Sequence, residues 1–99
     1  MFRHVVMFRW TAEASAESKA EVASGLAGLP AAIDTIRAYR FGPDAGLAAG
    51  NWDFVVVADF SDVDGYLVYR DHEVHQALIA QAILPIVAER AAVQYTLSD

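Results

Sequence analysis

The alternation of hydrophobic and polar positions along the chain predicts four β-strands. They are expected at residues 2–10, 33–41, 52–60 and 91–97. In the first of them every even-numbered position is apolar or aromatic except His4. Between the second and third strands, residues 42–50 contain three glycines and a proline, which favours a connecting loop that we expect to lie near any pocket as a flap.

Apolar residues at helical spacing predict helices in the remaining segments. The first is expected over the alanine-rich residues 14–29, with Pro30 closing it. A short helix is expected directly after Ser61. A second apolar stripe runs over residues 74–87, and we expect Pro85 to kink this helix or to split it in two.

The order strand, helix, strand, strand, helical segment, strand predicts a single α+β domain over residues 1–99. We expect a ferredoxin-like antiparallel four-stranded sheet with the helices on one face. Residues 52–60 are apolar on both sides of the strand, since Val55 and Val57 alternate with Phe54 and Val56. Because the helices can cover only one side, we expect the open face to pair with a second copy, giving a homodimeric α/β barrel.

Composition and charge narrow the range of partners. The chain is 56% hydrophobic, which favours burial of part of its surface against a partner subunit. Its net charge is −6 and it has no basic cluster, so neither nucleic acid nor an anionic membrane is an expected partner. It contains no cysteine, which excludes disulfides and thiolate chemistry and fits a cytoplasmic location.

The candidate chemistry lies in two short segments that hold all three histidines. His4 is in the first strand, and the others belong to the segment Tyr69-Arg-Asp-His72-Glu-Val-His75. If strand and helix pack together, a phenol and up to three imidazoles would meet at one pocket, which suits proton transfer near neutral pH. No third metal ligand accompanies His72 and His75, so no metal or other cofactor is expected. A structural polar cluster, with His72 capping a helix, is the second interpretation.

Four sequence elements point to a known family. They are His4-Val-Val-Met-Phe8, Leu29-Pro30, residues 53–60 followed by Ser61, and Tyr69-x-x-His72-x-x-His75. Together they resemble the stress-responsive A/B-barrel domain proteins, also called dimeric α/β barrels, over nearly the whole chain. Within that family the pattern is similar to a plant polyketide cyclase whose pocket lies between sheet and helices. The plant cyclase has a pocket tyrosine in its first helix, and this chain has no counterpart to it around Val22 to Leu26.

The resemblance implies roles for individual residues. His75 would be the general base, Tyr69 a catalytic proton donor, and His4 a group that orients His75 or binds a substrate oxygen. The implied substrate-binding residues are Val6, Phe8, Val56, Ala58 and His72. The implied reaction type is a cofactor-free aldol cyclisation of a polyketide-like chain.

Two classes of function therefore stay open. The first is a pocket for a small apolar, oxygenated molecule, aromatic or polyketide-like, with acid–base chemistry. The second is a non-catalytic, stress-related dimer or higher assembly. A cavity reached by His4, Tyr69 and His75 would favour the first class, and a filled interior would favour the second.

Overall fold

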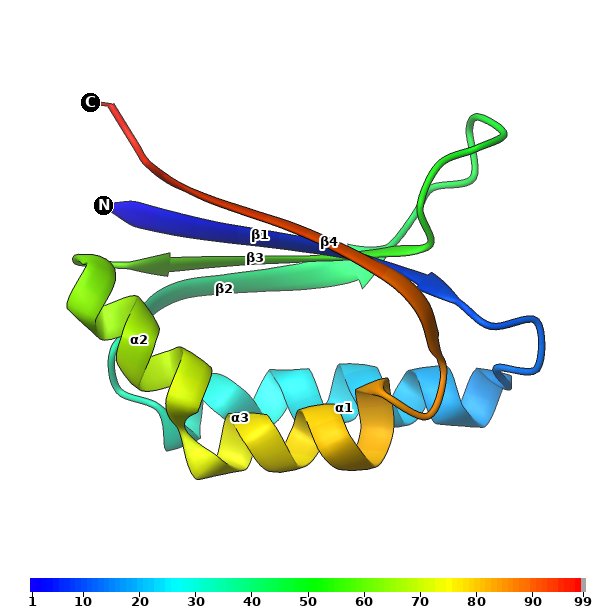
Figure 1. Cartoon of the computed structure of the whole chain (residues 1–99), viewed down its shortest axis with the longest axis horizontal. Coiled ribbons are helices and arrows are strands. Elements are labelled where there is room, and N and C mark those ends of the chain that lie inside the picture. The colour runs from blue at the N-terminus through cyan, green and yellow to red at the C-terminus, as the bar shows by residue number, and fades with distance from the viewer. Residues whose placement is uncertain (99) are drawn as a thin grey trace.

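A computed structural model describes residues 1–98 and shows a sheet with all helices on one side (Figure 1). The elements are β1 (Phe2–Trp10), α1 (Ala16–Ala32), β2 (Ile36–Pro43), β3 (Phe54–Phe60), α2 (Val63–Asp71), α3 (Glu73–Leu78), the π-helical segment η1 (Ile79–Ile83) and β4 (Val87–Thr96). The four strands lie in the order β2-β3-β1-β4, and every neighbouring pair is antiparallel. The predicted ferredoxin-like α+β fold is confirmed.

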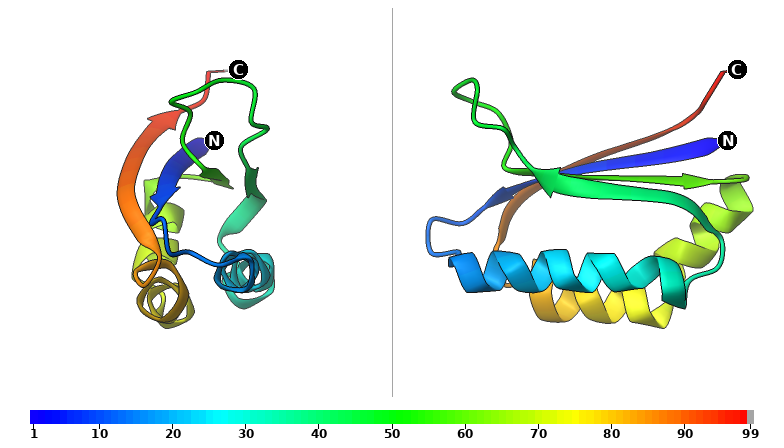
Figure 2. Two further views of the ribbon diagram at one scale, coloured as in Figure 1. Left: turned by 90° about the vertical axis from the view of Figure 1, so that its right-hand side faces the viewer. Right: turned by 180° about the vertical axis from the view of Figure 1, so that it is seen from behind.

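Strand β1 lies inside the sheet, between β3 and β4, and its two sides differ. His4, Val6 and Phe8 are each at most 5% exposed and face the helical layer, whereas Met7 is 36% exposed on the opposite side. The end-on view in Figure 2 shows that the helices cover one face of the sheet and leave the other open. Alternation along β1 therefore separates an inner face from an open face.

The core lies between the inner face and the helices. From α1, the spacing of Val22, Leu26 and Leu29 brings three fully buried side chains onto one stripe. Phe60 at the end of β3 is also fully buried, and its ring packs against Tyr69 of α2 with centroids 5.2 Å apart. This aromatic contact fixes α2 against the sheet.

Helix α1 begins and ends later than the sequence predicts. Its N-cap is Ser15, whose hydroxyl accepts from the Ser18 backbone N–H while the Ser18 hydroxyl bonds back to the N-cap. Pro30 lies inside the last turn rather than closing the helix, and the Ile33 N–H still donates to the Leu29 carbonyl at 2.9 Å beyond it. The second strand therefore starts at Ile36, and Ile33 is a buried helix cap.

The C-terminal apolar stripe is divided differently from the prediction. The helical segment α3–η1 ends at Ile83, and Pro85 stops it instead of kinking it. Ile86 accepts a backbone hydrogen bond from Thr11, and Val87 already opens β4. The last strand thus starts at Val87 and not at residue 91, because it pairs with β1 along nearly its whole length.

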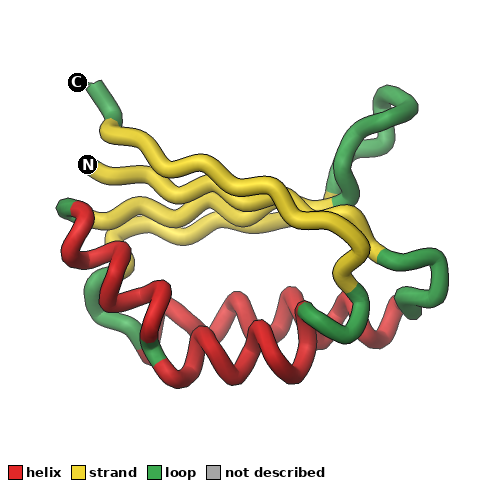
Figure 3. Tube along the Cα trace, viewed as in Figure 1, coloured by secondary structure: helices red, strands yellow, loops and turns green. Residues whose placement is uncertain are grey.

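The loop between β2 and β3 does not act as a flap over the helical side. In Figure 3 this green segment rises from the sheet on the side away from the helices. Its tip residue Leu47 is 90% exposed. At its base, Arg9 lies over the Trp52 ring, 4.5 Å from the ring centroid. The loop thus belongs to the open-face side of the molecule.

Two glycines of α1 differ in what surrounds them, which gives a test of helix packing. A Cβ added at Gly25 would overlap the side chain of Leu78 in α3. A Cβ added at Gly28 would have no neighbouring atom within 4 Å among the described residues, apart from its own helix backbone and chain neighbours. We expect Gly28→Ala to raise the free energy of unfolding by about 0.5–1 kcal/mol through helix propensity alone. Gly25→Ala should lose this gain to the overlap. Chemical denaturation of both variants checks this, and equal gains would contradict the close approach of α1 and α3.

Candidate active site

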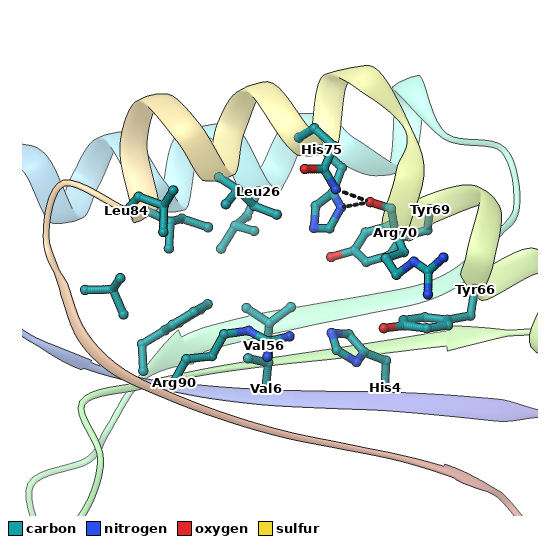
Figure 4. A pocket seen from close by; sticks show the side chains of 15 residues that line it. His4, Val6, Leu26, Val56, Tyr66, Tyr69, Arg70, His75, Leu84 and Arg90 are labelled. Atoms are coloured by element: carbon teal, nitrogen blue, oxygen red, sulfur yellow. Dashed lines mark hydrogen bonds between the residues drawn. The ribbon is translucent and has the colours of Figure 1, made fainter.

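A cavity of about 170 Å³ lies between the inner face of the sheet and the helices (Figure 4). Its apolar wall comes from Val6, Phe8, Leu26, Val56, Ile79, Ile83, Leu84 and Val87. Its polar lining is His4, Tyr66, Tyr69, Arg70, His75, Gln76 and Arg90. An apolar chamber with a few converging polar groups is the usual form of a small-molecule site.

His75 reaches the cavity from α3 and presents a basic nitrogen to it. Its Nδ1 lies 3.1 Å from the backbone carbonyl of Arg70, and since a carbonyl only accepts, Nδ1 carries the proton. In the neutral ring Nε2 therefore carries no proton, and the Nε2 side of the ring faces the cavity (Figure 4). Burial lowers the pKa of His75 below its ordinary value, which keeps the ring neutral at pH 7. His75 is thus equipped to accept a proton.

His4 has the opposite tautomer. The amide nitrogen of Gln94 donates to His4 Nδ1 at 2.8 Å, so the proton of the neutral ring is on Nε2. Burial, with a smaller contribution from the charge of Arg90, lowers the pKa of His4 to about 4. At neutral pH His4 is therefore an uncharged hydrogen-bond donor. The sequence-based prediction left its role open between orienting His75 and binding a substrate oxygen, and a donor suits the second.

Tyr69 lies between the two histidines. Its ring stacks on His75 with centroids 4.1 Å apart and is 6.1 Å from the ring of His4. The Tyr69 hydroxyl is 2.9 Å from the hydroxyl of Tyr39, which projects from β2. Burial raises the pKa of Tyr69 to about 12, so it stays protonated. When Tyr39 donates to Tyr69, the Tyr69 proton is available to a bound molecule.

The structure brings most of the predicted residues together, with two exceptions. His4, Val6, Phe8, Val56, Tyr69 and His75 all line the cavity. Ala58 is fully buried next to His4 in the sheet and is not a lining residue. The ring of His72 accepts from the Val74 backbone N–H at 3.1 Å and caps α3, so it lies outside the cavity. This position matches the capping role that the sequence also allowed.

Sequence reasoning missed several residues of the site. Tyr39 and Gln94 hold Tyr69 and His4, and Arg90 lines the cavity from β4. Tyr39 had a signal, since it alternates with Phe41 on one side of its strand. Gln94 and Arg90 had none, because polar residues in a last strand are ordinarily placed towards solvent.

No metal-binding cluster contributes to this site within residues 1–98. There, no group of three or more His, Asp or Glu side chains is arranged to hold a metal ion. In the same part of the chain, no helix has both the length and the apolar character needed to cross a membrane.

Comparisons with known proteins identify the family. Residues 2–97 match the model of the stress responsive A/B barrel domain. A dimeric ferredoxin-like protein of unknown function from Thermobifida fusca is 46% identical, with a TM-score of 0.90 over 97% of this chain and 90% of that chain. A dimeric ferredoxin-like protein from Bacteroides fragilis is 24% identical, with a TM-score of 0.82 over 97% of this chain and 95% of that chain.

A hydroxynitrile lyase from Passiflora edulis shares the fold at 16% identity, with a TM-score of 0.86 over 99% of this chain and 94% of that chain. No curated protein sequence matches this chain. The family model nevertheless spans almost all of the residues, and the Thermobifida protein shares nearly half of its sequence with them. The chain therefore belongs to the stress-responsive A/B barrel domain family.

Proposed function

We propose that the chain forms a homodimer in which each subunit binds a small apolar, oxygenated molecule and performs cofactor-free acid–base chemistry on it. The observation that carries the proposal is the pairing of tautomers around one cavity. His75 presents a basic nitrogen, while His4 and Tyr69 present N–H and O–H donors. A base and two donors facing one space are the groups that enolisation of a carbonyl compound requires.

The dimer is supported by the open face of the sheet. Met7, Val93 and Tyr95 are between 36% and 56% exposed there, beside the half-buried Val5 and Val57. Within the same face, Arg3 and Asp59 form a two-point ion pair at 2.7 and 2.8 Å. A largely apolar sheet face on which Arg3 and Asp59 neutralise each other is suited to burial against a second copy. The Thermobifida relative, at 46% identity, is described as dimeric.

The proposed reaction begins with removal of an α-proton by His75. As the C–H electron pair moves into the enolate, negative charge develops on the carbonyl oxygen, and His4 and Tyr69 stabilise it by hydrogen bonds. His75 becomes an imidazolium and returns its proton when the enolate carbon is reprotonated, or to the alkoxide when that carbon attacks a second carbonyl. The second course is the aldol cyclisation implied by the resemblance to the plant polyketide cyclase, which is olivetolic acid cyclase.

The enolisation step can be tested without knowing the natural substrate. In D₂O, we expect the wild-type protein to accelerate exchange of the CH₂ protons of 1-phenylpropan-2-one, as followed by proton NMR. His75→Gln removes the base and should lower the catalysed rate at least about tenfold, since general base catalysis contributes about 10²–10⁴-fold. The matched control is His72→Asn, which removes an imidazole outside the cavity but keeps a capping side chain.

The same assay separates the two classes of function. A wild-type rate that equals the His75→Gln rate would remove His75 from catalysis. It would favour the non-catalytic dimer or higher assembly as the function of this chain. Retained activity in His72→Asn together with loss in His75→Gln would place the chemistry in the cavity.

A further inference from the structure

We infer that the molecule bound in this cavity carries a carboxylate, and that Arg90 is the residue that binds it. The inference rests on the proposed ligand pocket and adds the charge of its ligand. The resulting ligand class is a small aromatic carboxylate, with one ring in the apolar part of the cavity and the anionic group against the guanidinium.

Arg90 lies on the inner face of the edge strand β4. It is paired in register with Phe8 of β1, whose side chain is buried towards the helices, so both residues point to the same side of the sheet. Arg90 is a lining residue, and Figure 4 shows its side chain extending along the sheet into the cavity towards His4. The guanidinium is therefore directed at the bound molecule.

Arg90 has no acidic partner within residues 1–98. It forms neither an ion pair nor a side-chain hydrogen bond there, although the chain carries six more acidic than basic residues. Arg70, the other arginine of the lining, is held by two contacts to Asp71 at 2.8 and 3.1 Å. Among the residues that the structure describes, no aspartate or glutamate lines the cavity. The cavity thus has an uncompensated positive charge on one side.

The charge of Arg90 acts on every candidate catalytic group. Burial has the largest effect on each pKa: it lowers those of His4 and His75, to which Arg90 adds, and it raises that of Tyr69, which Arg90 opposes. One cation is thus close to all three groups. Since both imidazoles are neutral, they leave Arg90 to neutralise an anionic ligand.

The size of the cavity limits the apolar part of the ligand. Its volume is about 170 Å³, and an apolar cavity of about 150 Å³ is known to hold a benzene ring. The wall opposite Arg90 is built from aliphatic residues, including Leu26 and Ile83. A single aromatic ring with one carboxylate therefore matches both the space and the charge.

Matched probes separate the charge of the ligand from its ring. Benzoate and benzamide have nearly the same shape but differ in charge, and acetate keeps the carboxylate without the ring. Binding of each is followed by titrating the imidazole proton NMR signals of His4 and His75 at pH 7 and low salt. The proteins are wild type, Arg90→Gln, Arg90→Lys and Arg37→Gln. Arg37 is the control because its side chain contacts Ser61 and the backbone of Asp34, away from the cavity.

We expect wild type and Arg37→Gln to bind benzoate about tenfold more tightly than benzamide. In Arg90→Gln the two affinities should become equal, and Arg90→Lys should keep part of the preference. The preference should weaken with added salt, because Arg90 is itself an exposed residue. Acetate should bind far more weakly than benzoate.

Other outcomes overturn the inference in distinguishable ways. Equal wild-type affinities for benzoate and benzamide, or a preference that survives Arg90→Gln, would reject Arg90 as a carboxylate site and leave the ligand pocket standing. Acetate binding as tightly as benzoate would reject the aromatic class in favour of a simple anion site. If no probe shifts the two imidazoles, both the carboxylate inference and the proposed pocket for ligands of this size are rejected.

Discussion

Val93→Asp is expected to convert the dimer into folded monomers. Val93 is 56% exposed in the single subunit, so the subunit alone tolerates a carboxylate at this position. It lies directly beside Val5 on the open face, which the proposed dimer buries. Under twofold symmetry each substitution introduces two unpaired charges into one interface. We expect the dissociation constant to rise at least about a hundredfold, measured by size-exclusion chromatography with light scattering over a dilution series.

Val68→Asp is the matched control for this prediction. Val68 is 49% exposed on α2, in the helical layer and not on the open face. The control substitution replaces valine with aspartate, as Val93→Asp does. It should leave the dimer intact. Circular dichroism of both variants confirms that the subunits stay folded. A Val93→Asp protein that remains dimeric at the lowest measurable concentration would show that the open face is not the interface.

The fold was predictable where local patterns and tertiary contacts agree. In β1, alternation placed His4, Val6 and Phe8 on one side, and the structure buries all three. The predictions failed where non-local pairing decides the structure. Residues 87–90 read Val-Ala-Glu-Arg and show no alternation, yet they are strand because β1 supplies their hydrogen-bond partners.

The site was predictable only in part, for the same reason. The sequence can suggest that Tyr69 and His75 reach one pocket, since they belong to one short segment. It cannot show that Tyr39 and Gln94, far away in the sequence, hold Tyr69 and His4. Hydrogen-bond partners that fix a tautomer come from neighbouring strands, and single-sequence patterns do not contain that pairing.

The buried His4 makes stability depend on pH. Its pKa is about 4 in the folded protein, against about 6.5 for an unperturbed imidazole, because burial disfavours the charged ring. Between these two values the unfolded chain binds a proton that the folded chain does not. Acid therefore favours unfolding: the contribution of His4 is fully present above about pH 6.5 and is lost as the pH falls to about 4.

The size of this effect can be measured by comparing variants. A pKa difference of about 2.5 corresponds to about 3 kcal/mol per subunit, lost between pH 6.5 and 4. We expect urea unfolding at fixed protein concentration to show this fall in the free energy of unfolding in wild type. The His4→Gln variant should not show the fall, whatever its absolute stability. Other acidic groups, including Asp59 with its pKa lowered by Arg3, contribute equally to both proteins and cancel.

His75→Gln provides the second comparison. The pKa of His75 is also lowered by burial, so this variant should lose its own smaller part of the pH dependence and keep that of His4. Direct NMR titration of the His4 ring gives an independent measurement, since its signals should stay at their neutral positions down to about pH 5. A His4 ring that titrates near 6.5, with equal pH dependence in wild type and His4→Gln, would contradict a neutral donor at this position. It would also remove the oxygen-binding group that the proposed enolisation requires.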